Sequence, residues 1–379
     1  MGPPAKEQGR PTVVLVIGSL QGGGAERQMA DMANFWAAKD WNVVVATWSG
    51  PEAADFYPLD ARVVRRNIET RLDAAAGHSR IRMNLDRVWH FRKLLTAVRP
   101  EVVLSFLTES NVLTILAAAA LDIRVVVSER VQPALHLALP KTWRVLRRLV
   151  YRWADAVVAQ TGDTASWLQA NCGTAVTVIP NALRRLPESS GQRGSVIVAV
   201  GRLTYQKGFD VLLRAFAQIA PRFADWTVAI VGEGEDRELL MRLRGELLLD
   251  ERVQFTGQTA DVGYWMNRAG LVVQPSRYEG FPNVVLESMG YGAAVISANC
   301  RSGPSDLIVD GVNGRLVPVD DVDALASAMA DLMSRPDERA RLGHEASNVR
   351  ERFRQDAVMK RWEQCLFPHR TLQRTPCAD

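Results

Sequence analysis

The chain has 379 residues, of which 47% are hydrophobic and 23% charged, a composition that excludes intrinsic disorder. Its length predicts two domains, each large enough for a core of its own. The net charge of +4 is unevenly spread, because residues 1–190 carry 23 Lys and Arg against 17 Asp and Glu while the rest is slightly acidic. This imbalance predicts an anionic partner for the first domain.

Short apolar runs rich in β-branched residues predict strands along the whole chain. In the first half they are Val13–Ile17, Val43–Thr47, Val102–Phe106, Val125–Ser128, Ala156–Gln160 and Val176–Ile179. In the second half they are Val196–Val200, Thr227–Val231, Val253–Phe255, Leu271–Gln274, Val295–Ser297 and Arg315–Val317. Amphipathic helical segments lie between the strands, among them Arg80–Val98, Phe209–Ile219 and Val322–Met333.

Strands that alternate with helices predict parallel sheets covered by helices on both faces. We therefore expect an α/β protein of two doubly wound, Rossmann-like domains that face each other across a ligand-binding cleft. The first should span residues 1–186 and the second residues 195–354, joined by the polar hinge Leu186–Gly194. The final helix, Gln355–Leu366, should cross back toward the first domain, so residues 355–379 form a third segment.

The cysteines and histidines are too scattered for a disulfide framework or a zinc site, and a reducing cytoplasm is expected. They are Cys172, Cys300, Cys365 and Cys377, and His78, His90, His136, His344 and His369. The start of the chain does not resemble a signal peptide. The longest apolar stretch, residues 112–127, is interrupted by Asp122 and Arg124 and favours a buried helix over a membrane span.

Three loops that follow predicted strands carry candidate site residues. In the first, residues 18–27, Gly23 and Gly24 let the backbone approach an anion at a helix N-terminus. The loop cannot be aligned with the GxGxxG dinucleotide fingerprint. The alternative is a turn that simply permits tight packing of strand and helix.

The second loop, Gly201–Gly208, places Arg202 and Lys207 where both can reach a diphosphate. A P-loop is excluded, because Gln206 precedes Lys207 where that motif needs glycine. The alternative is a pair of solvated surface charges.

The third loop contains Glu279, and Asn283 is expected to cap a helix that carries Glu287 in its second turn. The amides after Pro282 could bind a phosphate or a sugar hydroxyl, and Glu287 could accept two ribose hydroxyls. The alternative is a chance spacing of two carboxylates.

In their order and spacing these motifs resemble the family 4 retaining glycosyltransferases of the GT-B fold, over nearly the whole chain. The subgroup that assembles exopolysaccharides and lipid-linked oligosaccharides is most similar, on the segment Val127-Ser128-Glu129-Arg130. The matching pieces are Gly22–Arg27, Val178-Ile179-Pro180-Asn181, Gly201–Gly208, Val231-Gly232-Glu233-Gly234 and Glu279–Glu287.

The resemblance implies a role for each candidate residue. Arg202 and Lys207 would hold the donor diphosphate, Glu287 the ribose, and Gly23 and Gly24 would close over the diphosphate. Glu279 and the backbone of Phe281, Pro282, Asn283 and Val284 would hold the sugar and its β-phosphate; the catalytic residues would be Glu279, Arg202 and Lys207. Many members carry a histidine near Ser128, and here that sugar contact would pass to Glu129 or Arg130.

The resemblance favours UDP-linked N-acetylgalactosamine or galactose as donor over GDP-mannose, although the sequence does not locate the residues that read the base. The leaving diphosphate would take the acceptor's proton on the face from which it departs. No cofactor or metal is expected, because cations and helix ends can neutralise the diphosphate. The DxD sequence at Asp321 and Asp323 is better explained as a helix N-cap.

Two basic helical segments in the first domain predict a membrane-facing acceptor site. In Lys141–Trp153, Arg144, Arg147, Arg148 and Arg152 would meet anionic headgroups and Trp143 the interface. The second segment carries Arg80, Arg82, Arg87, Arg92 and Lys93. We therefore expect a cytoplasmic enzyme, peripheral on the inner face of the membrane, that extends a polyprenyl-diphosphate-linked glycan. The alternative is two solvated helices, and no nucleic-acid-binding module frames either of them.

Two other functions stay open. A nucleotide-sugar epimerase of the GT-B fold would share the two-domain cleft but would need different acid and base residues. A catalytically silent scaffold of a glycan assembly complex need not keep Arg202, Lys207 and Glu287 competent.

Overall fold

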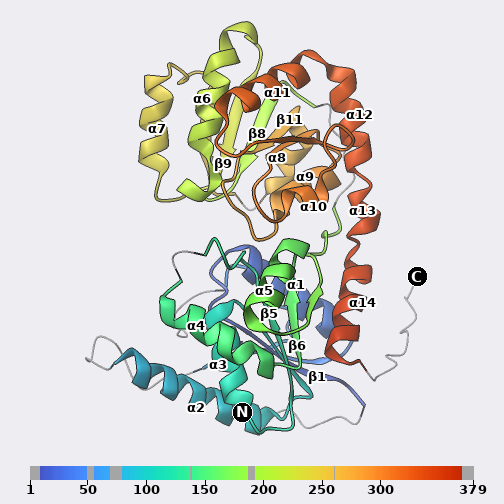
Figure 1. The fold of residues 1–379 in the computed structure, drawn as a ribbon. Helices are drawn as coiled ribbons and strands as arrows, with labels where there is room; N and C mark the ends of the chain where they lie inside the picture. Colours follow the sequence, from blue (N-terminus) through green and yellow to red (C-terminus); the bar gives the residue numbers. More distant parts are fainter. Residues whose placement is uncertain are drawn as a thin grey trace. The chain divides into compact units, whose positions relative to one another are not determined.

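The computed structural model describes residues 9–48, 55–68, 79–136, 139–186, 193–259 and 261–368. Contacts divide the chain into two units, one of Met1–Ile179 with Met359–Asp379 and one of Pro180–Val358 (Figure 1). Each unit contains a parallel sheet with helices on both faces. The predicted α/β architecture with two Rossmann-like sheets is confirmed.

The first unit contains, among its described residues, a seven-stranded parallel sheet in the order β3-β2-β1-β4-β5-β6-β7. The strands are β1 (Thr12–Ile17), β2 (Asn42–Thr47), β3 (Val64–Asn67), β4 (Val102–Phe106), β5 (Arg124–Ser128), β6 (Ala156–Ala159) and β7 (Val176–Val178). Strand β3 was not predicted from the sequence. As an edge strand it pairs only with β2, and its half-buried Val-Arg-Arg-Asn sequence lacks the apolar run of a central strand.

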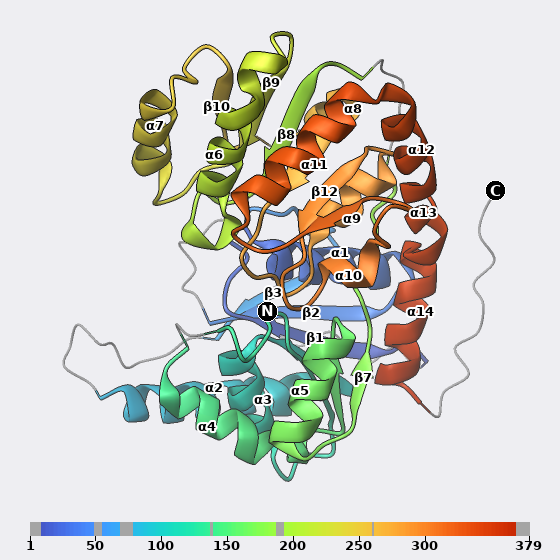
Figure 2. The same cartoon turned by 45° about the horizontal axis from the view of Figure 1, so that its top comes forward.

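The helices of this unit are α1 (Gly24–Ala38), α2 (Arg80–Val98), α3 (Thr108–Ala118), α4 (Lys141–Val150), α5 (Gly162–Cys172) and most of α14 (Gln355–Leu366), with a short 3-10 turn, η1 (Tyr151–Trp153), after α4. Helices α2 to α5 pack on one face of the sheet and α1 lies on the other (Figure 2). The apolar stretch 112–127 proves to be the buried end of α3, a turn and β5. Among the described helices, none is long and apolar enough to cross a membrane.

The second unit has a parallel sheet that, in the described chain, contains six strands in the order β10-β9-β8-β11-β12-β13. They are β8 (Val196–Val200), β9 (Thr227–Val231), β10 (Val253–Gly257), β11 (Leu271–Gln274), β12 (Val295–Ala298) and β13 (Arg315–Val317). The helices are α6 (Phe209–Ile219), α7 (Arg237–Glu246), α8 (Val262–Arg268), α9 (Asn283–Gly290), α10 (Pro304–Leu307), α11 (Val322–Ser334), α12 (Pro336–Ala346) and α13 (Val349–Arg352), with the 3-10 turns η2 (Tyr205–Lys207) and η3 (Ala220–Arg222).

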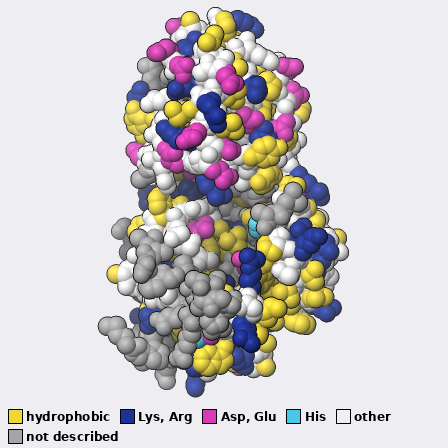
Figure 3. Space-filling view, turned by 90° about the vertical axis from the view of Figure 1, so that its left-hand side faces the viewer, with side chains coloured by type: hydrophobic (Ala, Val, Ile, Leu, Met, Phe, Trp, Pro, Cys, Tyr) yellow, Lys and Arg dark blue, Asp and Glu magenta, His cyan; other side chains and the backbone are white. Residues whose placement is uncertain are grey.

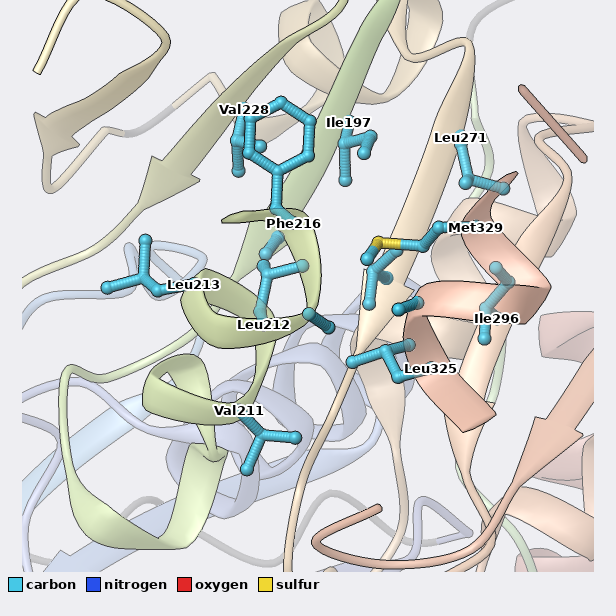
Figure 4. Close-up of a cluster of buried hydrophobic side chains, with 14 of the residues drawn as sticks. Ile197, Val211, Leu212, Leu213, Phe216, Val228, Leu271, Ile296, Leu325 and Met329 are labelled. Carbon is cyan, nitrogen blue, oxygen red and sulfur yellow. The ribbon is translucent and has the colours of Figure 1, made fainter. Parts of the chain in front are cut away.

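The core of the second unit is built on one face of this sheet by α6 and α11. Figure 4 shows Leu212 and Phe216 of α6 beside Leu325 and Met329 of α11, close to the strand residue Ile197. All five side chains are at most 1% exposed. Helices α8 and α9 cover the other face. This packing holds the strands rigidly, so the loops at their carboxyl ends start from defined positions.

The division between the units falls at Ile179 and Pro180, before the hinge predicted at residues 186–194. The boundary lies there because Leu183 already packs with the second unit. Its amide donates to the carbonyl of Phe353 (2.8 Å), and its side chain is buried in the core of that unit. Residues 187–192, most of the predicted hinge, lie outside the described residues. From Met359 onward the last helix groups with the first unit, where Glu363 pairs with Lys39 at 2.7 Å.

Candidate functional site

The loop after β8, which carries Arg202 and Lys207, packs directly on the backbone of the loop after β9. A Cβ atom on Gly232 would lie 1.9 Å from the carbonyl oxygen of Gly201, and one on Gly234 would lie 2.3 Å from that of Leu203. The amide of Leu203 donates to the carbonyl of Glu233 at 2.9 Å. The glycines of the predicted Val231–Gly234 motif therefore allow a close backbone approach that fixes the path of the Lys207 loop.

Lys207 and Glu279, which are 72 residues apart in the sequence, form an ion pair in the structure. The Lys207 Nζ atom lies 2.6 Å from Glu279 Oε1, and the two side chains are 16% and 7% exposed. Gly208 turns the chain at φ +65°, and a Cβ atom there would lie 2.2 Å from the carbonyl oxygen of Pro275. The loop after β8 therefore touches the loop after β11, and the pair holds an ammonium group at the carboxyl ends of the two strands. Arg202 lies on the same loop and is exposed.

Two residues that the sequence analysis missed complete the surroundings of Glu279. Gln274, buried at the end of β11, donates from Nε2 to Ser276 Oγ at 2.7 Å and to Glu279 Oε1 at 3.4 Å. Burial, and next the negative charge of Glu279, raise the pKa of the Cys300 thiol to about 12. Cys300 is therefore a neutral, buried neighbour of the carboxylate. Its nearness to Glu279 depends on strand order, which no local pattern displays.

Helix α9 starts one residue earlier than predicted, at Asn283, the residue expected to cap it. The N-cap is Pro282, which has no side-chain cap bond, and Asn283 is the first helical residue, so the expectation that Asn283 caps the helix is wrong. Its Oδ1 atom instead accepts a hydrogen bond from Asn181 Nδ2 at 2.7 Å. Phe281 and Pro282 are buried, and Val284 is half-buried in the first turn.

Glu287 lies in the second turn of α9, as expected, and is half-buried. Burial, and next the negative charge of Glu287, raise the pKa of Tyr291, at the end of the same helix. Within the second unit the structure therefore brings Lys207 together with Glu279, while Glu287 lies one helical turn along α9.

In the first unit, Gly23 and Gly24 mark the start of α1. Gly23 is the N-cap and Gly24 the first helical residue. A Cβ atom on Gly23 would lie 2.3 Å from Oε2 at the flexible end of the Glu26 side chain, and no backbone atom lies among its three nearest neighbours. The preceding Gly22 has φ +115° and packs against the ring of Phe56. The glycines therefore lie at the helix start, as the sequence predicts, and the role of Gly23 and Gly24 at a diphosphate stays a prediction.

Glu129 and Arg130 follow β5 and are almost completely buried. Glu129, 1% exposed, accepts hydrogen bonds from Tyr151 Oη (2.5 Å) and Thr108 Oγ1 (2.8 Å), and Arg147 Nη1 lies 3.7 Å from it. Burial raises the pKa of Glu129, against the opposing charge of Arg147. The Glu129 carboxylate is therefore bound by side chains of the first unit.

Arg130 is 6% exposed, and its guanidinium lies 4.1 Å from the centre of the Phe106 ring. Burial lowers its pKa to about 9. The sugar contact expected of Glu129 or Arg130 stays a prediction, and any such contact would involve side chains with little exposed surface.

The basic helix α4 has a different orientation from the one expected. Arg147 is 1% exposed and faces Glu129, so the expectation that it meets lipid headgroups is wrong. The outward face instead carries the apolar row Val145, Leu149 and Trp153, which are 48–60% exposed. Arg144 and Trp143 are half-buried, whereas the basic residues Lys141, Arg148 and Arg152 are exposed.

A similar apolar row lies on α2, which packs against α3 as α4 does. It consists of Ile81, Leu85 and Trp89, and Lys93 Nζ lies 3.5 Å from the centre of the Trp89 ring. Figure 3 shows basic and apolar side chains intermixed on the surface of the first unit. We call the two rows, together with the exposed basic residues Arg80, Arg82, Lys93, Lys141, Arg148 and Arg152, the α2–α4 surface.

The DxD sequence caps a helix, as expected, because Asp321 Oδ1 accepts from the amide of Ala324 at 2.8 Å at the start of α11. Across the described part of the chain, no three His, Cys, Asp or Glu side chains are grouped as metal ligands. A cavity of about 540 Å³ in the first unit lies elsewhere, at the amino end of β5 beside Trp153.

Comparison with known proteins agrees with this arrangement. Residues 22–184 match the family model described as Glycosyltransferase Family 4, and residues 186–349 match that of Glycosyl transferases group 1. The structure is similar to sucrose-phosphate synthase from Thermosynechococcus elongatus, with a TM-score of 0.81 and 19% identity, over 95% of this chain and 100% of that one. Anabaena HepE in complex with UDP and glucose has a TM-score of 0.80 and 21% identity, with 94% of this chain and 99% of that one covered. These define a glycosyltransferase of the GT-B fold. The chain belongs to glycosyltransferase family 4.

Relatives in sequence differ in how much of their length is matched. A Streptomyces coelicolor exopolysaccharide phosphotransferase is 33% identical over 55% of this chain, which spans only 23% of that protein. An uncharacterized glycosyltransferase of Haemophilus influenzae is 28% identical over 49% of this chain and 53% of its own length. A Campylobacter jejuni alpha-1,4-N-acetyl-D-galactosaminyltransferase, whose name gives a diNAcBac-PP-undecaprenol-linked acceptor, is 27% identical over 92% of this chain and 96% of its own.

Proposed function

We propose that this glycosyltransferase moves a hexose or N-acetylhexosamine from a UDP-sugar to a polyprenyl-diphosphate-linked glycan, with retention of configuration, in the assembly of a cell-surface polysaccharide. The observation that carries the proposal is the Lys207–Glu279 ion pair at the carboxyl ends of β8 and β11. The names of two similar proteins support the choice of substrates: HepE was solved with UDP-glucose, and the Campylobacter enzyme acts on an undecaprenol-linked glycan.

The reaction follows from the charges at these strand ends. Lys207 and Arg202 stabilise the negative charge that grows on the leaving diphosphate, and the first amides of α9 add their dipoles. The C1–O bond to the diphosphate breaks as the acceptor oxygen bonds to C1 on the same face, and the acceptor's proton passes to the leaving diphosphate. Glu279 holds Lys207 and faces the sugar, while Glu287 accepts the ribose hydroxyls. Because these cations neutralise the diphosphate, we propose that no metal takes part.

Donor binding tests this assignment. UDP-N-acetylgalactosamine or UDP-galactose should raise the melting temperature, since a ligand at 100 times its Kd adds about 2.7 kcal/mol to the free energy of unfolding. The shift should persist in EDTA, and GDP-mannose should give none. If only GDP-sugars raise the melting temperature, the proposed UDP-sugar donor is wrong. If no nucleotide sugar raises it, the alternative of a catalytically silent scaffold is favoured. An isomerised donor, detected by NMR without acceptor, would point to the epimerase.

We further propose that the α2–α4 surface rests on the inner face of the cytoplasmic membrane, where the acceptor is anchored. Its apolar rows suit the interface, and each exposed Lys or Arg adds on the order of 1 kcal/mol at an anionic surface. Its composition combines the two features that peripheral membrane binding needs, apolar side chains and positive charge.

Replacing two members of the apolar row, in Val145→Ser/Leu149→Ser, should abolish sedimentation with anionic liposomes and leave UDP affinity unchanged. The matched control is Leu239→Ser/Leu248→Ser, which removes two exposed apolar side chains (55% and 89%) from the second unit. If both double variants still sediment with the liposomes, the α2–α4 surface is a solvated face and does not bind the membrane. The proposed acceptor would then be a soluble glycan and not a lipid-linked one.

A further inference from the structure

Arg277, two residues before Glu279, is a side chain that the reaction above does not use. Its side chain is 10% exposed, and its guanidinium makes two hydrogen bonds to Asp210, from Nη1 to Oδ1 (2.9 Å) and from Nη2 to Oδ2 (2.8 Å). Its Nε atom lies 2.7 Å from Asp320 Oδ1. A two-pronged arginine–carboxylate contact of this kind fixes distance and orientation together.

The same residue also contacts the turn that ends in Lys207. The Arg277 amide donates to the carbonyl of Gln206 at 2.8 Å, and Nη1 donates to the carbonyl of Tyr205 at 2.7 Å. The guanidinium carbon lies 4.0 Å from the centre of the Tyr205 ring. In return, Gln206 Nε2 donates to the carbonyl of Tyr278 at 2.9 Å.

These partners lie on both sides of Lys207 in the sequence. Tyr205 and Gln206 precede it, Asp210 follows it in the first turn of α6, and Arg277 itself belongs to the loop of Glu279. The contacts of Arg277 therefore join the two loops whose side chains form the Lys207–Glu279 pair. Without them, the Lys207–Glu279 pair, the hydrogen bond from Gln206 to the carbonyl of Tyr278 and the packing of Gly208 against Pro275 would have to hold the turn in place.

We propose that Arg277 is a positioning residue, which fixes the Tyr205–Lys207 turn against the loop of Glu279 so that the Lys207 ammonium is in place before the donor diphosphate arrives. The inference rests on the proposed function, because it assigns Arg277 its effect through Lys207. A cation held in advance stabilises the leaving group without reorganising during the reaction, whereas a mobile one loses part of that effect. Lysine cannot reproduce the fork, since it offers a single ammonium on a flexible stem.

A double-mutant cycle with Lys207 tests this. Arg277→Ala should lower kcat at saturating donor by about tenfold or more, and Arg277→Lys should lower it nearly as much. In the Lys207→Ala background, Arg277→Ala should cost less than about threefold further, because both changes remove the same effect. Two costs that multiply independently would overturn the inference. Arg335→Ala, which removes an exposed arginine paired with Asp331 at 2.9 Å, should leave kcat unchanged.

A second variant, Asp210→Asn, and the donor binding and transfer of wild type complete the test of Arg277. If Arg277→Ala does not fold, Asp210→Asn removes the charged partner at nearly constant shape and should show the same non-additivity with Lys207→Ala. If wild type binds and transfers a donor while the cycle is additive, only the role of Arg277 is lost. If wild type neither binds nor transfers any nucleotide sugar, the proposed function fails, and the inference fails with it.

Discussion

Lys207→Ala is expected to lower kcat by about 10²-fold or more, the cost of removing one preorganised group that stabilises transition-state charge. The ammonium lies at the carboxyl ends of β8 and β11 and is held 2.6 Å from Glu279. Because negative charge on the diphosphate grows as the sugar bond breaks, the loss should appear mainly in kcat. Steady-state kinetics at saturating donor measure it.

The matched control is Lys39→Ala. Lys39 forms a similar ion pair, with Glu363 at 2.7 Å, but in the first unit and on none of the three candidate loops. It should change kcat little, whereas Lys207→Arg should recover part of the lost activity, since it restores a positive charge at the loop. A rate that is unchanged in Lys207→Ala with saturating donor would remove Lys207 from the mechanism.

Arg147→Ala should lower the free energy of unfolding by about 3–5 kcal/mol, as expected when one partner of a buried ion pair is removed. Arg147 and Glu129 are each 1% exposed, so the substitution would leave a buried carboxylate without its cation. It would also remove the guanidinium, whose carbon lies 4.8 Å from the centre of the Trp167 ring. Denaturant unfolding measures the change, and Arg148→Ala, which removes the exposed neighbouring arginine, should cost far less. Equal costs for the two variants would contradict the buried pair.

The pH dependence of stability should change in a defined direction. Burial already raises the pKa of Glu129, and loss of Arg147 removes the charge that opposes this rise. A carboxyl whose pKa is raised in the folded state contributes stability at low pH and loses it as pH rises through that pKa. The free energy of unfolding of Arg147→Ala should therefore fall more steeply than that of wild type as the pH rises above the ordinary pKa of a glutamate carboxyl. Parallel pH profiles would show that Glu129 does not titrate in this way.

The alternation of strands and helices could be predicted from the sequence alone, as could the position of each candidate loop at a strand end. These features are local: an apolar run that is buried on both faces looks the same wherever its strand lies in the sheet, and parallel strands place their carboxyl ends at one edge. The capping role of Asp321 could be predicted for the same reason, since a cap involves residues only three apart. Strand β3 could not be predicted in this way, because an edge strand does not need an apolar run.

The contacts between side chains that lie far apart in the sequence could not be predicted, because they form only in the folded chain. The pairing of Lys207 with Glu279 and the contact of Asn181 with Asn283 join residues 72 and 102 positions apart, and they depend on strand order and loop path. Arg147 is the clearest case. A basic residue among basic residues on an amphipathic helix is expected in solvent, yet it is buried because Glu129, at the end of a neighbouring strand, supplies the opposite charge that makes burial tolerable. The sequence shows which residues carry charge. Whether a charged residue can be buried depends on an oppositely charged partner, and the tertiary structure determines which partner lies beside it.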